Sequence, residues 1–197
     1  MIKLGVTGGI GSGKSVVCEI LRLHGIPIFN ADIEAKNLND TSPVIRAQLI
    51  KHFGEDIYRG TKLDKQKFAR IIFQSPKNVK IANSIIHPEL AKHFARWAKD
   101  RAHHPIIALD AALLFEAGFD AYLDYIITVS APRESRIARA MERDKATKAE
   151  IEARMSKQMP EEEKIRRSHF VIENNNVKPL IEQVSAILNH LNLSAMH

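Results

Sequence analysis

The chain has 197 residues, 45% hydrophobic and 26% charged, which is ordinary for a globular protein that buries one sizeable core. No stretch approaches the roughly 18 uninterrupted apolar residues of a membrane span, and the single cysteine, Cys18, excludes an intramolecular disulfide framework. The net charge of +6 favours polyanionic partners, but lysine and arginine are scattered rather than gathered into a basic block. We therefore expect a cytoplasmic protein that binds neither membranes nor nucleic acid.

A glycine-rich segment lies between the first predicted strand, Ile2–Val6, and the first predicted helix, Lys14–His24. Its sequence, Gly8-Gly9-Ile10-Gly11-Ser12-Gly13-Lys14-Ser15, fits the pattern G-x-x-x-x-G-K-[ST]. In such a loop, backbone N–H groups and the helix N-terminus surround phosphates, the lysine reaches the β- and γ-phosphates and the serine hydroxyl binds Mg²⁺. A chance glycine turn is the alternative, but the flanking strand and helix favour a site for a nucleoside triphosphate.

Five short apolar segments predict a parallel sheet with helices on both faces. They are Ile2–Val6, Ile26–Phe29, Ile106–Leu109, Tyr125–Val129 and Phe170–Ile172. The second and third segments are too far apart for one crossover helix, so we expect an insertion between them. Helical patterns in the insertion cover Pro43–Phe53, Asp64–Gln74, Pro76–Ile86 and Pro88–Arg101, with His87-Pro88 breaking the last two helices apart.

These segments predict one α/β domain over residues 1–197. We expect a core at about 1–33, 104–143 and 168–191, and a helical acceptor-binding insertion at about 34–103. A charged segment at about 144–167 has helical period but little apolar content, so we expect a mobile lid there. Its run Glu161–Lys164 resembles a solvated helix start, and Asn192–His197 is expected to be a frayed tail.

Two carboxylates follow predicted strands, where the carboxyl ends face the ligand crevice of an open sheet. Asp32 could accept a proton from an acceptor hydroxyl, or it could simply cap the helix that follows. Asp110 could contact Mg²⁺ or its water, or it could be a cap or turn residue.

Three arginines, Arg136, Arg139 and Arg143, share one predicted helix face at the start of the lid. Guanidinium groups of one sign repel one another unless a polyanion lies nearby, and their planar fork suits phosphate oxygens. We expect at least one of them to contact phosphate. The alternative is a solvated face paired with Glu134 and Glu142.

Read together, these segments closely resemble the dephospho-CoA kinase family from residue 1 to about residue 190. The matching motifs are Gly5–Ser15, Asn30-Ala31-Asp32, His87-Pro88, Leu113–Glu116, Arg139, Arg143-Asp144, Arg154, Gln158 and Asn174. Departures from the family's pattern are Asn30 for an aspartate, Ala112 for a proline, Val16 for a threonine, and Ser168-His169 for Ala-Asp. None of these changes removes a residue that the chemistry requires.

The resemblance implies a P-loop kinase fold and ATP-dependent phosphorylation of the ribose 3′-hydroxyl of dephospho-CoA, giving CoA and ADP in the last step of coenzyme A biosynthesis. Implied catalytic residues are Asp32, Lys14 and Arg139, and implied acceptor contacts are Asp32, His87 and Arg143. Implied metal contacts for Mg²⁺ are Ser15 and Asp110. The implied ATP site comprises Gly8, Gly9, Ile10, Gly11, Ser12, Gly13, Lys14, Ser15, Val16 and Asn174.

Other readings of the same loop predict different partners. Another small-molecule kinase of this fold would share the loop without the remaining motifs. A regulatory nucleotide switch would need no acceptor-activating carboxylate, and a nucleic-acid-associated ATPase should present a contiguous basic face. We expect a small-molecule substrate and a monomer, with a homo-oligomer as the alternative.

Overall fold

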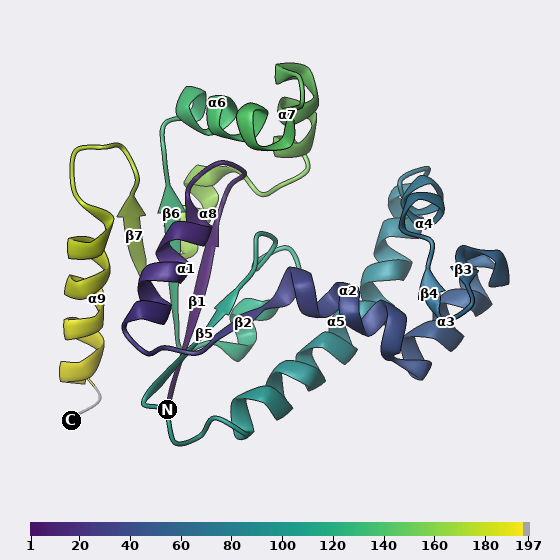
Figure 1. Ribbon diagram of the computed structural model, residues 1–197, viewed down its shortest axis with the longest axis horizontal. Coiled ribbons are helices and arrows are strands. Elements are labelled where there is room, and N and C mark those ends of the chain that lie inside the picture. The colour runs from purple at the N-terminus through teal and green to yellow at the C-terminus, as the bar shows by residue number, and fades with distance from the viewer. Residues whose placement is uncertain (195–197) are drawn as a thin grey trace. The chain divides into compact units, whose positions relative to one another are not determined.

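The computed structural model describes residues 1–194 and divides into two compact units (Figure 1). One unit comprises Met1–Phe29 together with the chain from Arg101 onward, and the other comprises Asn30–Asp100. The first unit contains the phosphate loop, and the second overlaps the insertion expected at about 34–103. Within the described residues, no helix is both long enough and apolar enough to cross a membrane.

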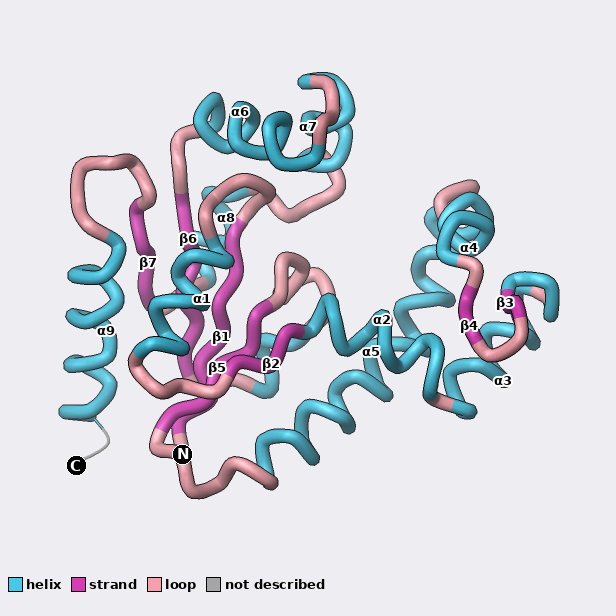
Figure 2. Tube along the Cα trace, in the orientation of Figure 1, coloured by secondary structure: helices cyan, strands magenta, loops and turns pink. Residues whose placement is uncertain are grey.

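A five-stranded parallel sheet forms the centre of the first unit (Figure 2). Its order is β2-β5-β1-β6-β7. The strands are β1 (Ile2–Gly8), β2 (Ile28–Asn30), β5 (Ile106–Asp110), β6 (Tyr125–Ser130) and β7 (Phe170–Glu173). The five predicted strands are confirmed. Because the strands are parallel, their carboxyl ends meet at one edge, where Gly8 lies opposite Val129 and Val6 opposite Asp110.

Helices cover both faces of this sheet, as predicted. On one face, α1 (Lys14–Leu23) and α9 (Leu180–Ser194) pack over alternate strand residues, in a core that includes Leu4, Val6 and Ile127. On the other face, α8 (Glu161–Arg167) lies against β6, and a short helix, η2 (Phe119–Tyr122), follows the loop after β5. Helix α9 continues through Ser194, so the frayed tail expected over Asn192–His197 is wrong for residues 192–194. The rest of that tail, residues 195–197, lies outside the described residues.

Two further helices lie between β6 and α8. These are α6 (Arg133–Asp144) and α7 (Lys148–Met155), which pack together around Ile137, Ala140 and Ile151. A capping box begins α7, because the Thr147 and Glu150 side chains bond each other's backbone N–H groups. The helical pattern predicted for the lid is therefore confirmed, while its mobility stays a prediction.

The run Glu161–Lys164 is not the solvated helix start that its charge predicts. Lys164 is fully buried, and its ammonium donates to the carbonyl of Ala112 at 2.8 Å and lies 3.3 Å from the Glu116 carboxylate. Helix α8 has a single apolar residue, Ile165, so its face against β6 must include polar side chains. Burial lowers the pKa of Lys164, and Glu116 opposes that effect.

The second unit is mainly helical. It comprises α2 (Ala31–Thr41), α3 (Pro43–Phe53), η1 (Glu55–Ile57), β3 (Tyr58–Arg59), β4 (Lys62–Leu63), α4 (Lys65–Ile72) and α5 (Pro76–Lys99). The small antiparallel hairpin of β3 and β4 is not among the predicted elements. It turns at Gly60, whose φ of +61° favours glycine.

The predicted break at His87-Pro88 is wrong, because α5 runs through it without interruption. Proline removes the hydrogen bond to the carbonyl of Ser84, but Ser84 and Pro88 are exposed and water can reach that carbonyl. Buried residues on both sides of the proline, including Ala82 and Leu90, anchor the two halves of the helix. Tertiary packing thus overrides the helix-breaking tendency of proline.

Candidate active site

The phosphate loop joins the carboxyl end of β1 to the start of α1. Gly11 and Gly13 have φ values of +76° and +96°, in the left-handed region that favours glycine. Gly13 is also the N-cap residue of α1, and no side chain caps the helix there. The first N–H groups of α1 therefore remain available to an anion at the positive end of the helix dipole.

Neighbouring side chains fix the shape of this loop from outside. A Cβ atom on Gly9 would collide with the guanidinium of Arg136, and one on Gly13 would collide with the amide of Asn174. The Asn174 amide donates to the carbonyl of Ser12 at 2.8 Å, and its backbone N–H donates to Ser130. Asn174 thus lies beside the loop as the predicted ATP site requires, although the resemblance did not predict that it holds the loop backbone.

Lys14 and Asp110, two of the predicted site residues, form an ion pair. Asp110 ends β5 directly beside β1, and its side chain is 6% exposed, against 16% for Lys14. The carboxylate therefore orients the lysine at the carboxyl edge of the sheet. The interpretation of Asp110 as only a cap or turn residue does not account for this contact.

The residues present are compatible with Mg²⁺ bound together with a nucleotide. Among the described residues, no group of three or more His, Cys, Asp or Glu side chains could hold a metal ion by itself. Mg²⁺ is typically bound by one or two protein oxygens together with phosphate and water, which is what Ser15 and Asp110 could supply. The enclosed hydroxyl of Ser12 also has no hydrogen-bond partner within the described chain, so the loop has an unsatisfied polar atom.

The three arginines of α6 have three different environments. Arg136 is buried, forms an ion pair with Glu161 and donates to the carbonyl of Ile10. Arg143 is exposed and pairs with Asp144, whose carboxylate raises the pKa of Arg143. Neither arginine forms an ion pair with Glu134 or Glu142, the partners expected on a solvated helix face.

Arg139 is more exposed than Arg136 and less exposed than Arg143. It is half-buried, and its Nη1 atom is enclosed without a hydrogen-bond partner in the described part of the chain. A buried guanidinium nitrogen without a partner is costly, so this atom suits an anionic ligand.

Asp32 lies in the first turn of α2, and Asn30 is the N-cap. The Asn30 side chain accepts from the N–H of Ile33 at 2.9 Å. The alternative interpretation of Asp32 as the cap is therefore wrong. Asp32 is exposed and forms no hydrogen bond or ion pair with the residues that the structure describes. Asn30, a departure from the family's pattern, thus has a structural role.

His87 lies within α5 and is half-buried. Burial lowers the pKa of its imidazole, so the ring is neutral at pH 7. A neutral ring can donate through one nitrogen and accept through the other.

Sequence reasoning missed the roles of Glu161 and Lys164. Glu161 pairs with Arg136 and accepts from the N–H of Ala131 at 3.2 Å. The available signal was their three-residue spacing, which places both on one face of a short helix that has almost no apolar residues.

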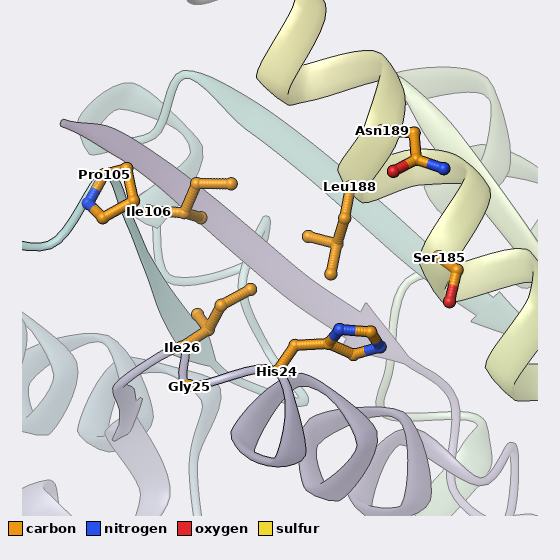
Figure 3. A pocket seen from close by; sticks show the side chains of 8 residues that line it. All are labelled: His24, Gly25, Ile26, Pro105, Ile106, Ser185, Leu188 and Asn189. Atoms are coloured by element: carbon orange, nitrogen blue, oxygen red, sulfur yellow. The ribbon is translucent and has the colours of Figure 1, made fainter.

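Cavities among the described residues of the first unit include the following two. One, of about 360 Å³, lies beside Asn174 and is lined by residues 174 and 176–180. The other, of about 390 Å³, is lined by residues 24–26 after α1, residues 105 and 106 at the start of β5, and Ser185, Leu188 and Asn189 of α9 (Figure 3). This second cavity lies at the amino end of β5. The phosphate loop follows the carboxyl end of β1, which is parallel to β5, so the second cavity is at the far end of the sheet from the candidate site.

Comparison with known proteins identifies the family. A family model for dephospho-CoA kinase, CoaE, matches residues 2–179. The chain belongs to the dephospho-CoA kinase family. A dephospho-CoA kinase of Bacteroides fragilis is 42% identical over 190 residues, covering 96% of this chain and 93% of the relative. A dephospho-CoA kinase of Porphyromonas gingivalis is 42% identical over 162 residues, covering 82% and 80%.

Solved structures share the fold of this chain. A crystal structure from Thermus thermophilus superposes with a TM-score of 0.84 at 34% identity, covering 96% of this chain and 97% of the other. A shikimate kinase from Acinetobacter baumannii superposes with a TM-score of 0.52 at 15% identity, covering 98% of this chain and 94% of the other. The second likeness shows the fold alone. The P-loop kinase fold predicted from the sequence is confirmed.

Proposed function

We infer that this chain transfers the γ-phosphoryl group of ATP to the ribose 3′-hydroxyl of dephospho-CoA, giving CoA and ADP. This is the last step of coenzyme A biosynthesis. The observation that carries the inference is the family match over residues 2–179, which spans the phosphate loop, the insertion and the lid segment. In the first unit, the contacts of Lys14 and Asn174 and the enclosed nitrogen of Arg139 support roles for these residues.

The loop and the start of α1 bind the phosphates of ATP. Backbone N–H groups of the loop that have no acceptor among the described residues, at Gly13, Lys14 and Ser15, bind the β- and γ-phosphates, and Lys14 moves from Asp110 toward the transferred group. Ser15 and Asp110 would hold Mg²⁺, which would neutralise charge on the phosphate oxygens.

The adenosine part of ATP occupies the cavity beside Asn174. The support for this placement is that Asn174 contacts both the loop, through Ser12, and this cavity of about 360 Å³. A purine between the loop after β7 and the phosphate loop would be continuous with phosphates at the start of α1.

Asp32 orients the acceptor hydroxyl and takes its proton. The support is that Asp32 is exposed in the first turn of α2 while Asn30 performs the capping. A carboxylate without a structural partner is free to act on a substrate. In the same unit, His87 hydrogen-bonds the acceptor as a neutral imidazole.

Arg139 neutralises charge on the phosphoryl group during transfer, through its enclosed Nη1 atom. Arg143 contributes to acceptor binding. Closure of residues 144–167 over the site excludes water from the reaction, which prevents simple hydrolysis of ATP. A monomeric state and a cytoplasmic location stay predictions.

An acceptor survey tests this proposal. ADP formation by the purified chain is measured with Mg²⁺ and ATP in the presence of dephospho-CoA, shikimate, gluconate or adenosine monophosphate. We expect ADP formation to require dephospho-CoA. Comparable turnover with another acceptor, or none with dephospho-CoA, would overturn the proposal.

A further inference from the structure

Ile10, in the middle of the phosphate loop, is fixed through its backbone and its side chain. Its N–H donates to Oε1 of Gln158 at 3.1 Å, and its carbonyl accepts from Nε of Arg136 at 3.1 Å. Its side chain packs against the cluster formed by Ile137, Ala140 and Ile151. All of these contacts come from the segment between β6 and α8, far from the loop in sequence.

Arg136 is itself fixed in place. It is 6% exposed and its guanidinium forms an ion pair with Glu161, which also accepts from the N–H of Ala131. The guanidinium occupies the space that a Cβ of Gly9 would need, and the carbonyl of Arg136 does the same at Gly11. With Nε and Nη1 committed to protein acceptors, Arg136 supports the loop from outside, whereas Arg139 retains an enclosed nitrogen for a ligand.

We propose that Arg136 and Gln158 are positioning residues that hold the phosphate loop through the two polar backbone groups of Ile10. They keep the N–H groups of Gly13, Lys14 and Ser15 oriented toward the phosphates before ATP arrives. Gln158 lies just after α7 and Arg136 near the start of α6, so the conformation of the lid segment and that of the loop are coupled. The inference rests on the proposed binding of ATP by this loop.

Loss of either side chain should weaken the binding of ATP and leave the binding of the acceptor unchanged. Without either contact, the loop samples other conformations, and part of the binding energy of ATP is used to restore the productive one. The acceptor, which the insertion binds, does not depend on Ile10. A role in stability alone would lower the melting temperature and leave the affinity of the folded protein for ATP unchanged.

The test uses full-length Arg136→Met and Gln158→Met, with Arg133→Met as the matched control. Arg133 lies on the same helix but is 59% exposed and pairs with Glu134 and Glu152 at the surface. Dissociation constants for ATP with Mg²⁺ and for dephospho-CoA are measured separately by calorimetry, and thermal unfolding confirms that each variant is folded. Binding of ATP alone is informative even if the acceptor proves to be a different molecule.

We expect each variant to bind ATP about tenfold more weakly and dephospho-CoA as well as the wild type does. Because both contacts act on one residue, the double variant should lose less than the product of the two single losses. ATP affinity within about twofold of wild type in folded variants would overturn the proposal, and so would an equal loss for both ligands. Gln158→Met leaves the Arg136–Glu161 ion pair intact, so it decides the question if Arg136→Met does not fold.

Discussion

Lys14 of the phosphate loop is ion-paired with Asp110 at the end of β5, and both side chains are largely buried. The two residues are neighbours because β1 and β5 are adjacent parallel strands whose carboxyl ends meet at the same edge. The pair orients the lysine in the absence of phosphate. In the proposed ATP complex, Lys14 exchanges this carboxylate for a phosphate.

Lys14→Met should lower kcat/KM by about 10²–10³-fold, because a cationic donor to the developing charge is lost. It should also destabilise the fold, because the nearly buried Asp110 carboxylate loses its partner. The double variant Lys14→Met/Asp110→Asn should recover stability without recovering activity. Denaturant unfolding and steady-state kinetics measure the two effects. Wild-type turnover in Lys14→Met would contradict the assignment of the loop.

Asp32→Asn should lower kcat by about 10²–10⁴-fold, because an amide cannot accept the hydroxyl proton. Its free energy of unfolding should stay within about 0.5 kcal/mol of wild type, since Asp32 forms no hydrogen bond or ion pair within the described residues and Asn30 is the cap. Asn30→Ala is the matched control. It should cost about 1 kcal/mol of stability through the lost cap. Unchanged turnover in Asp32→Asn would remove Asp32 from the chemistry.

Arg139→Lys keeps the positive charge but loses the planar fork. We expect kcat to fall about 10²-fold with a much smaller change in the dissociation constant of ATP, because the contact strengthens in the transition state. Arg133→Lys, on the exposed surface of the same helix, should behave as wild type. Small and equal changes in kcat and ATP affinity would place Arg139 outside the reaction.

Burial of the Cys18 thiol should make the stability of the fold depend on pH. The thiol is buried in the core beneath α1, and burial raises its pKa from 9.0 to about 12. Above pH 9 the unfolded chain releases this proton while the folded chain keeps it, so the free energy of unfolding falls as pH rises. Below pH 9 the thiol is protonated in both states, so the stability contributed by its burial is fully present.

We expect the stability of wild type relative to Cys18→Ala to fall by about 2 kcal/mol between pH 8 and pH 10.5. Urea unfolding with a reductant at the two pH values measures this difference. Parallel pH profiles for the two proteins would show that the thiol is not protected by burial.

Much of the fold was predictable from local patterns. Apolar runs and the glycine loop identified all five strands of the sheet, because a strand buried on both faces must be almost continuously apolar. The failures occurred where tertiary contacts decide the outcome. Pro88 continues α5 because buried residues anchor the helix on both sides, and Lys164 is buried because the face of α8 against β6 has little else to present.

In the candidate site, too, local patterns were predictable and tertiary contacts were not. The pattern around Lys14 and Ser15 predicted a phosphate site because the spacing in such a loop is set by the backbone itself. The ion pair of Arg136 with Glu161 was not predictable, since nothing local relates residues on two separate helices. The alternative of Asp32 as the cap of α2 was wrong because Asn30 performs that role; both residue types favour caps, and only the geometry distinguishes them.

The most direct measurement of the central claim follows the transferred phosphoryl group. The chain is incubated with Mg²⁺, dephospho-CoA and ATP labelled at the γ-phosphate, and the labelled product is isolated and treated with a 3′-nucleotidase. The account predicts one labelled product that elutes with CoA and from which the 3′-nucleotidase releases the label as inorganic phosphate. An acceptor that lacks the 3′-hydroxyl should give no labelled product. Label appearing as inorganic phosphate regardless of acceptor, or on any other hydroxyl, would contradict the account.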